Sequence, residues 1–142
     1  NMEIINLLDF TNRIELRNWL KINHNQAKSG WVITSRSKQP TYECIPYIEV
    51  VEEALCFGWI DSTIKKLPDG RLAQRLSPRR KISHWTELNK ERCMNLEDRG
   101  LMTDAGRQAF EKSYSYEVVP KGSPIEEIIK KHNMELRPEL YK

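Results

Sequence analysis

Apolar residues recur at helical spacing in four segments of the chain, and two of these segments lie in its first 60 residues. Thr11 or Asn12 can cap a helix that runs to about Asn23, with Leu16 and Leu20 on its apolar face. The next pattern is clearer, because apolar residues share one face of the predicted helix and glutamates occupy the other. The two faces consist of Tyr47, Val50, Val51 and Ala54 against Glu49, Glu52 and Glu53.

Two further helices are expected in the second half of the chain. One begins next to Ser83 and continues to about Asp98, and the other is capped by Thr103 and ends near Ser113. Small residues on one face of the last helix favour close packing against another helix. That face consists of Met102, Gly106, Ala109 and Ser113. A capping box over residues 123–126 predicts one short helix in the tail.

The sequence contains fewer patterns typical of strands than of helices. Residues 30–35 (GWVITS) are rich in strand-forming residues and predict one strand. Pro68, Asp69 and Gly70 are turn-forming residues in sequence, so the flanking segments predict a β-hairpin over residues 59–77.

These elements together predict an α+β fold. We expect a mostly helical single domain with a small antiparallel β-sheet or hairpin and a C-terminal helical hairpin. A chain of 142 residues suits one domain, which we place at residues 2–115, with residues 116–142 as a C-terminal extension.

The composition and the cysteine content indicate in which compartment the protein is found. The chain is 39% hydrophobic and 30% charged, which is ordinary for a soluble protein. No apolar run approaches the ~18 residues of a membrane span, and the N-terminus lacks the basic leader of a secretory signal. The three cysteines are far apart and odd in number, which favours free thiols. We therefore expect a cytoplasmic protein.

Charge is distributed unevenly along the chain. The whole chain carries a formal charge of +3, yet residues 63–81 hold seven basic residues against Asp69 alone. This basic patch comprises Lys65, Lys66, Arg71, Arg75, Arg79, Arg80 and Lys81. A positive ribbon of this kind could bind nucleic acid without sequence preference. The alternative is a solvated hairpin, partly neutralised by Glu49, Glu52 and Glu53 on the neighbouring helix.

A second candidate site combines a strand and a helix. Trp85, Asn89 and Arg92 fall on one stripe of the predicted helix, where a buried arginine needs a partner. They either tie the helix to a carbonyl or a carboxylate such as Asp61 or Glu53, or they line a site for an anionic ligand. Trp59 and Asp61 alternate onto one face of the predicted strand. The candidate ligand-binding residues are thus Trp59, Asp61, Trp85, Asn89 and Arg92.

No catalytic residues, metal site or cofactor are predicted. The three histidines lie far apart, and none pairs with cysteine or an acid at ligand spacing. Glycine-rich phosphate loops and nucleophile elbows are also missing from the sequence. We therefore expect a protein that is not an enzyme.

Several uncommon motifs resemble one protein family. They are Tyr47 followed by VVEEALCFGWIDS, then SPRRKISHWTELNKER, and then RGLMTDAGRQAFE. Over about residues 10–115 the chain is similar to the bacterial YdeI/OmpD-associated family, also called bacteriocin-protection or OmdA-like proteins. The resemblance implies a role in stress or antimicrobial-peptide tolerance, through a partner or an anionic ligand.

Three functions thus remain open from the sequence. The first is the tolerance role that the resemblance implies. The second is nucleic-acid binding by the basic patch over residues 63–81. The third is a small-molecule anion site around Arg92, Asn89 and Asp61.

Overall fold

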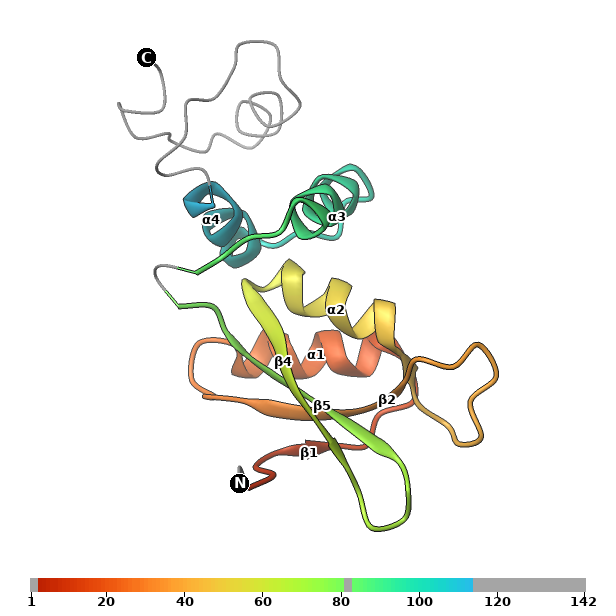
Figure 1. Cartoon of the computed structure of the whole chain (residues 1–142). Coiled ribbons are helices and arrows are strands. Elements are labelled where there is room, and N and C mark those ends of the chain that lie inside the picture. Colours follow the sequence, from red (N-terminus) through yellow and green to blue (C-terminus); the bar gives the residue numbers. More distant parts are fainter. Residues whose placement is uncertain (1–2, 81–82, 114–142) are drawn as a thin grey trace, which may run out of the picture.

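The computed structural model describes residues 3–80 and 83–113, and Figure 1 shows how they are arranged. Within this part of the chain, five strands and four helices alternate irregularly. The strands are β1 (Leu7–Leu8), β2 (Gly30–Ser35), β3 (Ile45–Pro46), β4 (Trp59–Lys66) and β5 (Leu72–Pro78). The helices are α1 (Arg13–Asn23), α2 (Tyr47–Cys56), α3 (Glu87–Asp98) and α4 (Asp104–Lys112). The short helix expected over residues 123–126 lies outside the described residues.

The strands form one mixed sheet in the order β1-β2-β5-β4. β5 pairs antiparallel with β2 and β4, whereas β1 and β3 pair in parallel with the first and last parts of β2. The predicted fold class, mostly helical with a small antiparallel hairpin, is therefore wrong. Roughly 39% of the described residues are helical and 23% are in strands. β1 and β3 have two residues each, too few for any period to show in the sequence.

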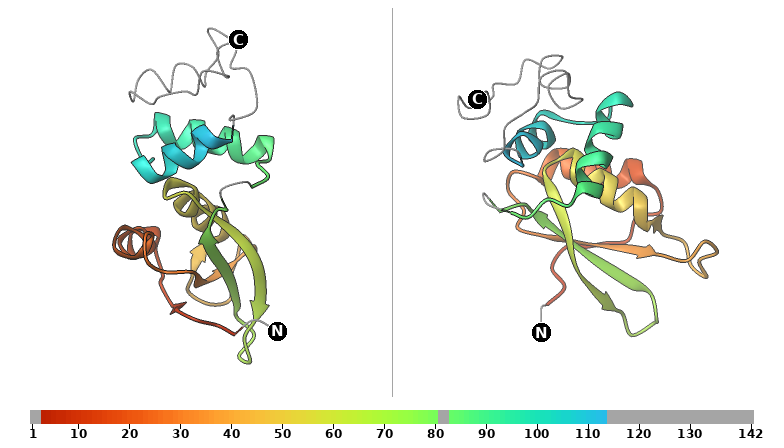
Figure 2. Two further views of the ribbon diagram at one scale, coloured as in Figure 1. Left: turned by 90° about the vertical axis from the view of Figure 1, so that its left-hand side faces the viewer. Right: turned by 45° about the horizontal axis from the view of Figure 1, so that its top comes forward.

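Helices cover one face of the sheet in two tiers. α1 and α2 pack on the sheet, and α3 and α4 lie beyond α2, on its side away from the sheet (Figures 1 and 2). Trp59 belongs to the core between these layers and is 1% exposed. Its ring meets Trp19 edge-on, and its indole N–H donates to the His24 carbonyl over 3.2 Å. None of the helices in the described ranges has the length and apolar character to cross a membrane.

The helix boundaries largely follow the predictions. Asn12 caps α1 by accepting a hydrogen bond from the Glu15 N–H over 3.1 Å. α3 begins only at Glu87, because Thr86 provides its N-terminal cap rather than a residue near Ser83. The hairpin over residues 59–77 is confirmed, and its turn places Gly70 at a φ of +92°.

α4 packs closely against the end of α2, as its small residues predicted. A Cβ atom at Gly106 would lie 2.7 Å from the carbonyl carbon of Cys56, so only glycine fits there. Gly58 ends α2 with a φ of +75° and lies against Ala105 and Ala109. The contact fixes the helical pair α3–α4, which we call the helical cap, on top of α2.

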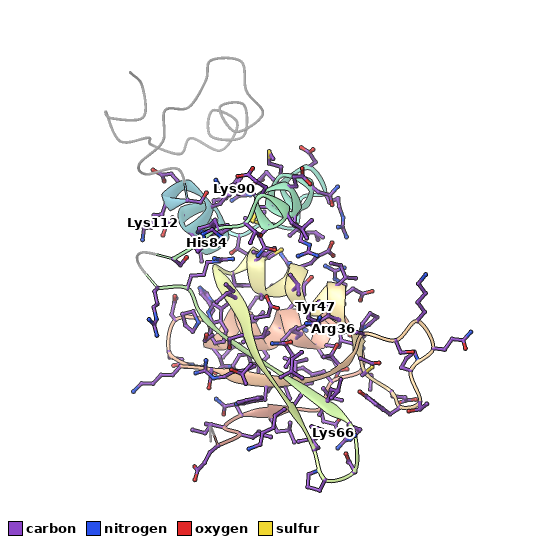
Figure 3. The ribbon with its side chains drawn as sticks, in the orientation of Figure 1. Arg36, Tyr47, Lys66, His84, Lys90 and Lys112 are labelled. Atoms are coloured by element: carbon purple, nitrogen blue, oxygen red, sulfur yellow. The ribbon has the colours of Figure 1, made fainter. Side chains whose placement is uncertain are left out.

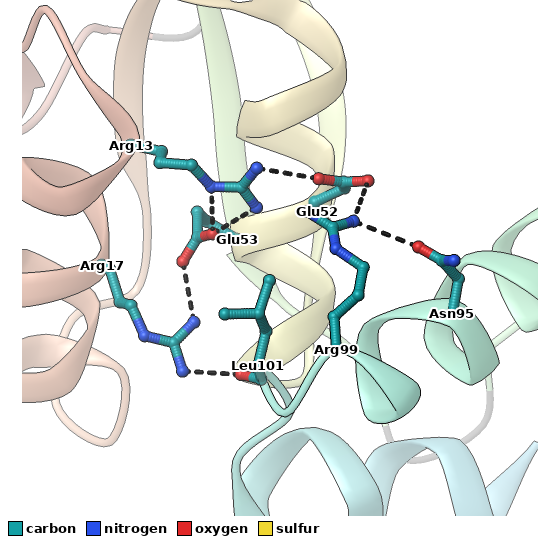
Figure 4. A network of polar contacts seen from close by, with 7 residues as sticks. All are labelled: Arg13, Arg17, Glu52, Glu53, Asn95, Arg99 and Leu101. Atoms are coloured by element: carbon teal, nitrogen blue, oxygen red, sulfur yellow. Dashed lines mark hydrogen bonds and ion pairs between the residues drawn. The ribbon is translucent and has the colours of Figure 1, made fainter.

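An ion-pair network binds α1, α2 and the end of α3 together (Figure 4). Glu53 is only 1% exposed, and its carboxylate accepts from Arg13 over 2.6 Å and from Arg17 over 3.0 Å. Glu52 binds Arg13 and Arg99. These glutamates therefore do not neutralise the basic hairpin, contrary to one expectation from the sequence. Two arginines satisfy the buried carboxylate, as a buried charge requires.

Candidate functional site

The residues of the basic patch have different surroundings. Arg71 forms ion pairs with Asp9 and Asp69, at N–O distances of 3.2 and 2.9 Å. Figure 3 places Lys66 near the turn of the hairpin, whereas His84, in the segment that follows the basic patch, lies beside the helical cap. The exposed members are Lys65, Lys66 and Arg80, while Lys81 lies outside the described residues. The patch is therefore not one continuous cluster of unpaired cations.

Arg79 differs from the other basic residues because its guanidinium is largely buried. It follows β5 directly and stacks on the indole of Trp85, with its central carbon 3.7 Å from the ring centroid. Nη1 donates to the Ser83 hydroxyl over 3.3 Å and to the His84 carbonyl over 3.4 Å. Nε and Nη2 are buried and have no hydrogen-bond partner within residues 3–80 and 83–113. One edge of the guanidinium thus presents two donors with no acceptor.

Burial also changes the acidity of this group. Loss of solvent lowers the pKa of Arg79 to about 10, and the nearby Cys93 and Asp61 oppose the shift only in part. The guanidinium stays charged at neutral pH. A desolvated, charged and half-unpaired arginine is unusual in a folded protein and is typical of a functional position.

The charge of Asp61 acts on the pKa of Arg79, but no ion pair or hydrogen bond joins the two side chains in the described ranges. The Oδ2 atom of Asp61 accepts a hydrogen bond from the Tyr47 hydroxyl over 2.7 Å, and no ion pair to a basic residue forms in the described ranges. A bulge in β4 directly after Asp61 sets two residues, Ser62 and Thr63, opposite Arg75. The salt bridge expected for Asp61 is therefore not formed, and a tyrosine holds its carboxylate instead.

Tyr47 is the first residue of α2, and charged side chains act on its hydroxyl. The guanidinium carbon of Arg36 lies 4.0 Å from the centroid of the Tyr47 ring, and Figure 3 shows the two side chains together. Burial, followed by the hydrogen bond to Asp61, raises the pKa of Tyr47, while Arg36 and Arg92 act in the opposite direction. The hydroxyl therefore stays protonated at neutral pH and remains a donor to Asp61.

The other predicted residues differ in how they relate to this group. On α3, Arg92 donates to the Asn89 side-chain oxygen over 2.9 Å, so neither Asp61 nor Glu53 is its partner. Trp85 supports Arg79, whereas Trp59 is buried in the core and does not belong to the site. We define the Arg79 site as Tyr47, Asp61, Arg79, Trp85 and Arg92.

The side chains of this site are suited to binding charged groups. Within residues 3–80 and 83–113, no group of three or more histidine, cysteine or acidic side chains could hold a metal ion. Burial raises the pKa of Cys56 to about 11 and of Cys93 to about 12, so neither thiol is a nucleophile at neutral pH. What the site offers is a guanidinium edge, a positioned carboxylate and an aromatic surface.

Sequence reasoning found part of this site. It selected Asp61, Trp85 and Arg92, together with Trp59 and Asn89, which are not part of the site. It treated Arg79 only as one member of a charged patch. Arg79 and Trp85 both lie between the end of β5 and the start of α3, so no period links them. One signal for Tyr47 was available, because a phenol on the apolar face of a helix needs a polar partner.

Comparison with known proteins identifies a family. Residues 8–109 match the family described as "Domain of unknown function (DUF8412)", and this region extends from β1 into α4. No curated protein and no solved structure matches the chain. Because the match covers more than half of its length, the chain belongs to this family, whose description assigns no activity.

Proposed function

We propose that the chain is a non-enzymatic binding protein that takes a small anionic ligand at the Arg79 site. The observation that supports this most directly is the buried edge of Arg79. Two charged N–H groups without an acceptor are costly, and native proteins keep few of them. Carboxylate and phosphate groups match such an edge with two parallel hydrogen bonds.

The surroundings of Arg79 prepare it for this role. Stacking on Trp85 fixes the plane of the guanidinium, and the two bonds from Nη1 fix its rotation. A donor pair that is already oriented loses little conformational entropy when a ligand binds. Because the free edge is buried, a ligand reaches it only when neighbouring side chains move. We therefore expect association to be slower than diffusion allows.

Further positive charge lies close to the site. The Arg36 guanidinium packs on the Tyr47 ring, and the charges of Arg36 and Arg92 both act to lower the pKa of the hydroxyl that binds Asp61. With Arg79 they give three cations against one carboxylate, so the surroundings favour a ligand with net negative charge. The resemblance to the YdeI/OmpD-associated family supports a physiological role in stress or antimicrobial-peptide tolerance.

Calorimetric titration with inorganic phosphate and with acetate tests the proposal. Arg79→Lys keeps the charge but removes the two-donor edge, so we expect affinity for both anions to fall about tenfold or more. The matched control is Arg75→Lys, since Arg75 lies on β5, just before Arg79 in the chain, and within the described residues its side chain donates to the Ser62 hydroxyl. Equal affinities in the wild type and Arg79→Lys, or no anion binding at all, would contradict the proposal.

Nucleic-acid binding is a second candidate, which the exposure of Lys65, Lys66 and Arg80 favours. Fluorescence anisotropy with single- and double-stranded DNA and RNA at ~50 mM salt tests it. A double substitution, Lys65→Glu with Lys66→Glu, should abolish binding and leave phosphate titration at Arg79 unchanged. If no nucleic acid binds, or if the double variant binds as well as the wild type, this candidate is excluded.

A further inference from the structure

β4 is the last strand on its side of the sheet, and its second half is open to solvent. The strand order β1-β2-β5-β4 gives β4 a single neighbour among the described strands, which is β5. The left view of Figure 2 shows β4 outermost in the sheet. Trp59 at its start is buried, whereas residues 62–66 are exposed. An exposed edge of this kind presents backbone donors and acceptors that another strand can use.

The pairing with β5 shows which backbone groups of β4 are open. In an antiparallel pair, residues that bond to the neighbouring strand alternate with residues whose N–H and C=O point outward. The Leu67 N–H donates to the Arg71 carbonyl over 2.8 Å, which fixes the alternation. By register, Lys65 then bonds to β5, whereas Ile64 and Lys66 direct both backbone groups outward. In the described part of the chain, no backbone hydrogen bond joins these outward groups to another element.

Positive charge lies at both ends of this open stretch. Arg75 reaches across from β5, and its Nη1 donates to the Ser62 hydroxyl over 3.5 Å. Lys66 is exposed at the other end. The segment 63–81 contains seven basic residues and Asp69 as its single acid. A strand added to this edge therefore meets a positive surface, which favours acidic side chains.

A second copy of the chain does not fit this edge. Two β4 strands paired antiparallel around this stretch would bring Lys65 and Lys66 of one copy against the same lysines of the other. The bulge at Ser62 and Thr63 also bends the edge. Lysines and bulges of this kind protect sheet edges from pairing with their own copies. The same lysines attract a strand of opposite charge.

The side chains of β4 indicate what the partner strand contains. Successive residues of a strand point to opposite faces, so Ile64 and Lys65 lie on different faces of the hairpin. Ile64 is 39% exposed and offers an apolar neighbour. We propose that the edge of β4 over residues 63–66 pairs with an extended segment of a partner protein, in which acidic and apolar residues alternate. Backbone bonds supply the affinity and the lysines supply the preference for acids. The inference does not depend on a ligand at Arg79.

Amide hydrogen exchange measured by NMR is the first test. The probe is a six-residue peptide of alternating glutamate and valine with blocked ends. In the free protein the amides of Ile64 and Lys66 should exchange quickly and that of Lys65 slowly, because only Lys65 bonds to β5. Saturating peptide should slow the two fast amides at least about tenfold. Absence of peptide binding, or binding that leaves both amides unprotected, would overturn the inference.

A second peptide separates strand pairing from attraction between charges. N-methylation of every residue removes the backbone donors and keeps the side chains and the charge, so affinity should fall at least about tenfold. A peptide of alternating lysine and valine has the donors but the wrong charge, and we expect it not to bind. If the parent and methylated peptides bind equally, or if single-stranded DNA binds more tightly than the parent, the surface attracts any polyanion and the inference is wrong.

Charge reversal on the protein is the third test. Lys66→Glu should lower the affinity for the acidic peptide at least about fivefold, because an attractive neighbour becomes a repulsive one. Lys21→Glu is the matched control, since Lys21 is an exposed lysine of α1 and the change in net charge is the same. Its affinity should stay within about twofold of the wild type. Equal losses in the two variants, or full affinity in a folded Lys66→Glu protein, would contradict the inference.

Discussion

Replacing Arg79 with methionine should make the protein slightly more stable, although a half-buried arginine would be removed. The lowered pKa of Arg79 measures how much burial destabilises the charged guanidinium in the folded state. A shift from 12.5 to about 10 corresponds to roughly 3 kcal/mol, which partial solvent exposure reduces to about 2 kcal/mol. The penalty is present at every pH below about 10, because the guanidinium is charged in the folded and unfolded chains alike.

The interactions that Arg79→Met removes contribute less than this penalty. Two long hydrogen bonds from Nη1 contribute about 0.5 kcal/mol each. The stack on Trp85 contributes about 1 kcal/mol, of which a methionine thioether retains about half. The net effect is a gain of about 0.5 kcal/mol in the free energy of unfolding, or some 1–2 °C in melting temperature.

Arg17→Met is the matched comparison. Arg17 binds the buried Glu53 carboxylate over 3.0 Å and the Leu101 carbonyl over 2.6 Å, so its removal should cost about 3 kcal/mol. Urea denaturation of both variants, without added ligand, gives the two changes. If Arg79→Met loses as much stability as Arg17→Met, Arg79 is a structural residue and the argument for an anion site fails.

Three further predictions concern the packing of the helices and the reactivity of the cysteine thiols. Glu53→Gln should lower the free energy of unfolding by about 3 kcal/mol, because two arginines of α1 lose a buried carboxylate; an unchanged urea midpoint would contradict this. Gly106→Ala should destabilise by about 2–3 kcal/mol in thermal denaturation, since its methyl group would press on the α2 backbone; a wild-type melting temperature would be incompatible with the helical cap as described. With a thiol reagent at about pH 8, the partly exposed Cys44 should react first, whereas the pKa of Cys56 is raised to about 11 and that of Cys93 to about 12. These two thiols should react only on unfolding, and three equally fast thiols in the folded protein would show that they are not buried.

Local patterns predicted much of the architecture. Caps and apolar spacing located α1, α2 and α4, and the turn at Pro68 to Gly70 located the β4–β5 hairpin. These features depend on neighbouring residues, so the sequence contains them directly. The fold class was nevertheless predicted wrongly, because the two shortest strands join the sheet through β2, far from them in sequence. Strand pairing between separate segments of the chain produces no periodic pattern of residues in the sequence.

The order of residues specifies where the helices, the hairpin and the positive charge lie along the chain, because each depends on residues within a few positions of one another. Which charges find a partner depends instead on how the folded chain brings distant residues together. The tertiary structure gave Glu53 two arginines from another helix, and it buried one edge of Arg79 without an acceptor. It also paired the Asp61 carboxylate with the Tyr47 hydroxyl, which comes from another element. Partners in three dimensions set the free energy of a buried charge, and the order of residues does not specify those partners.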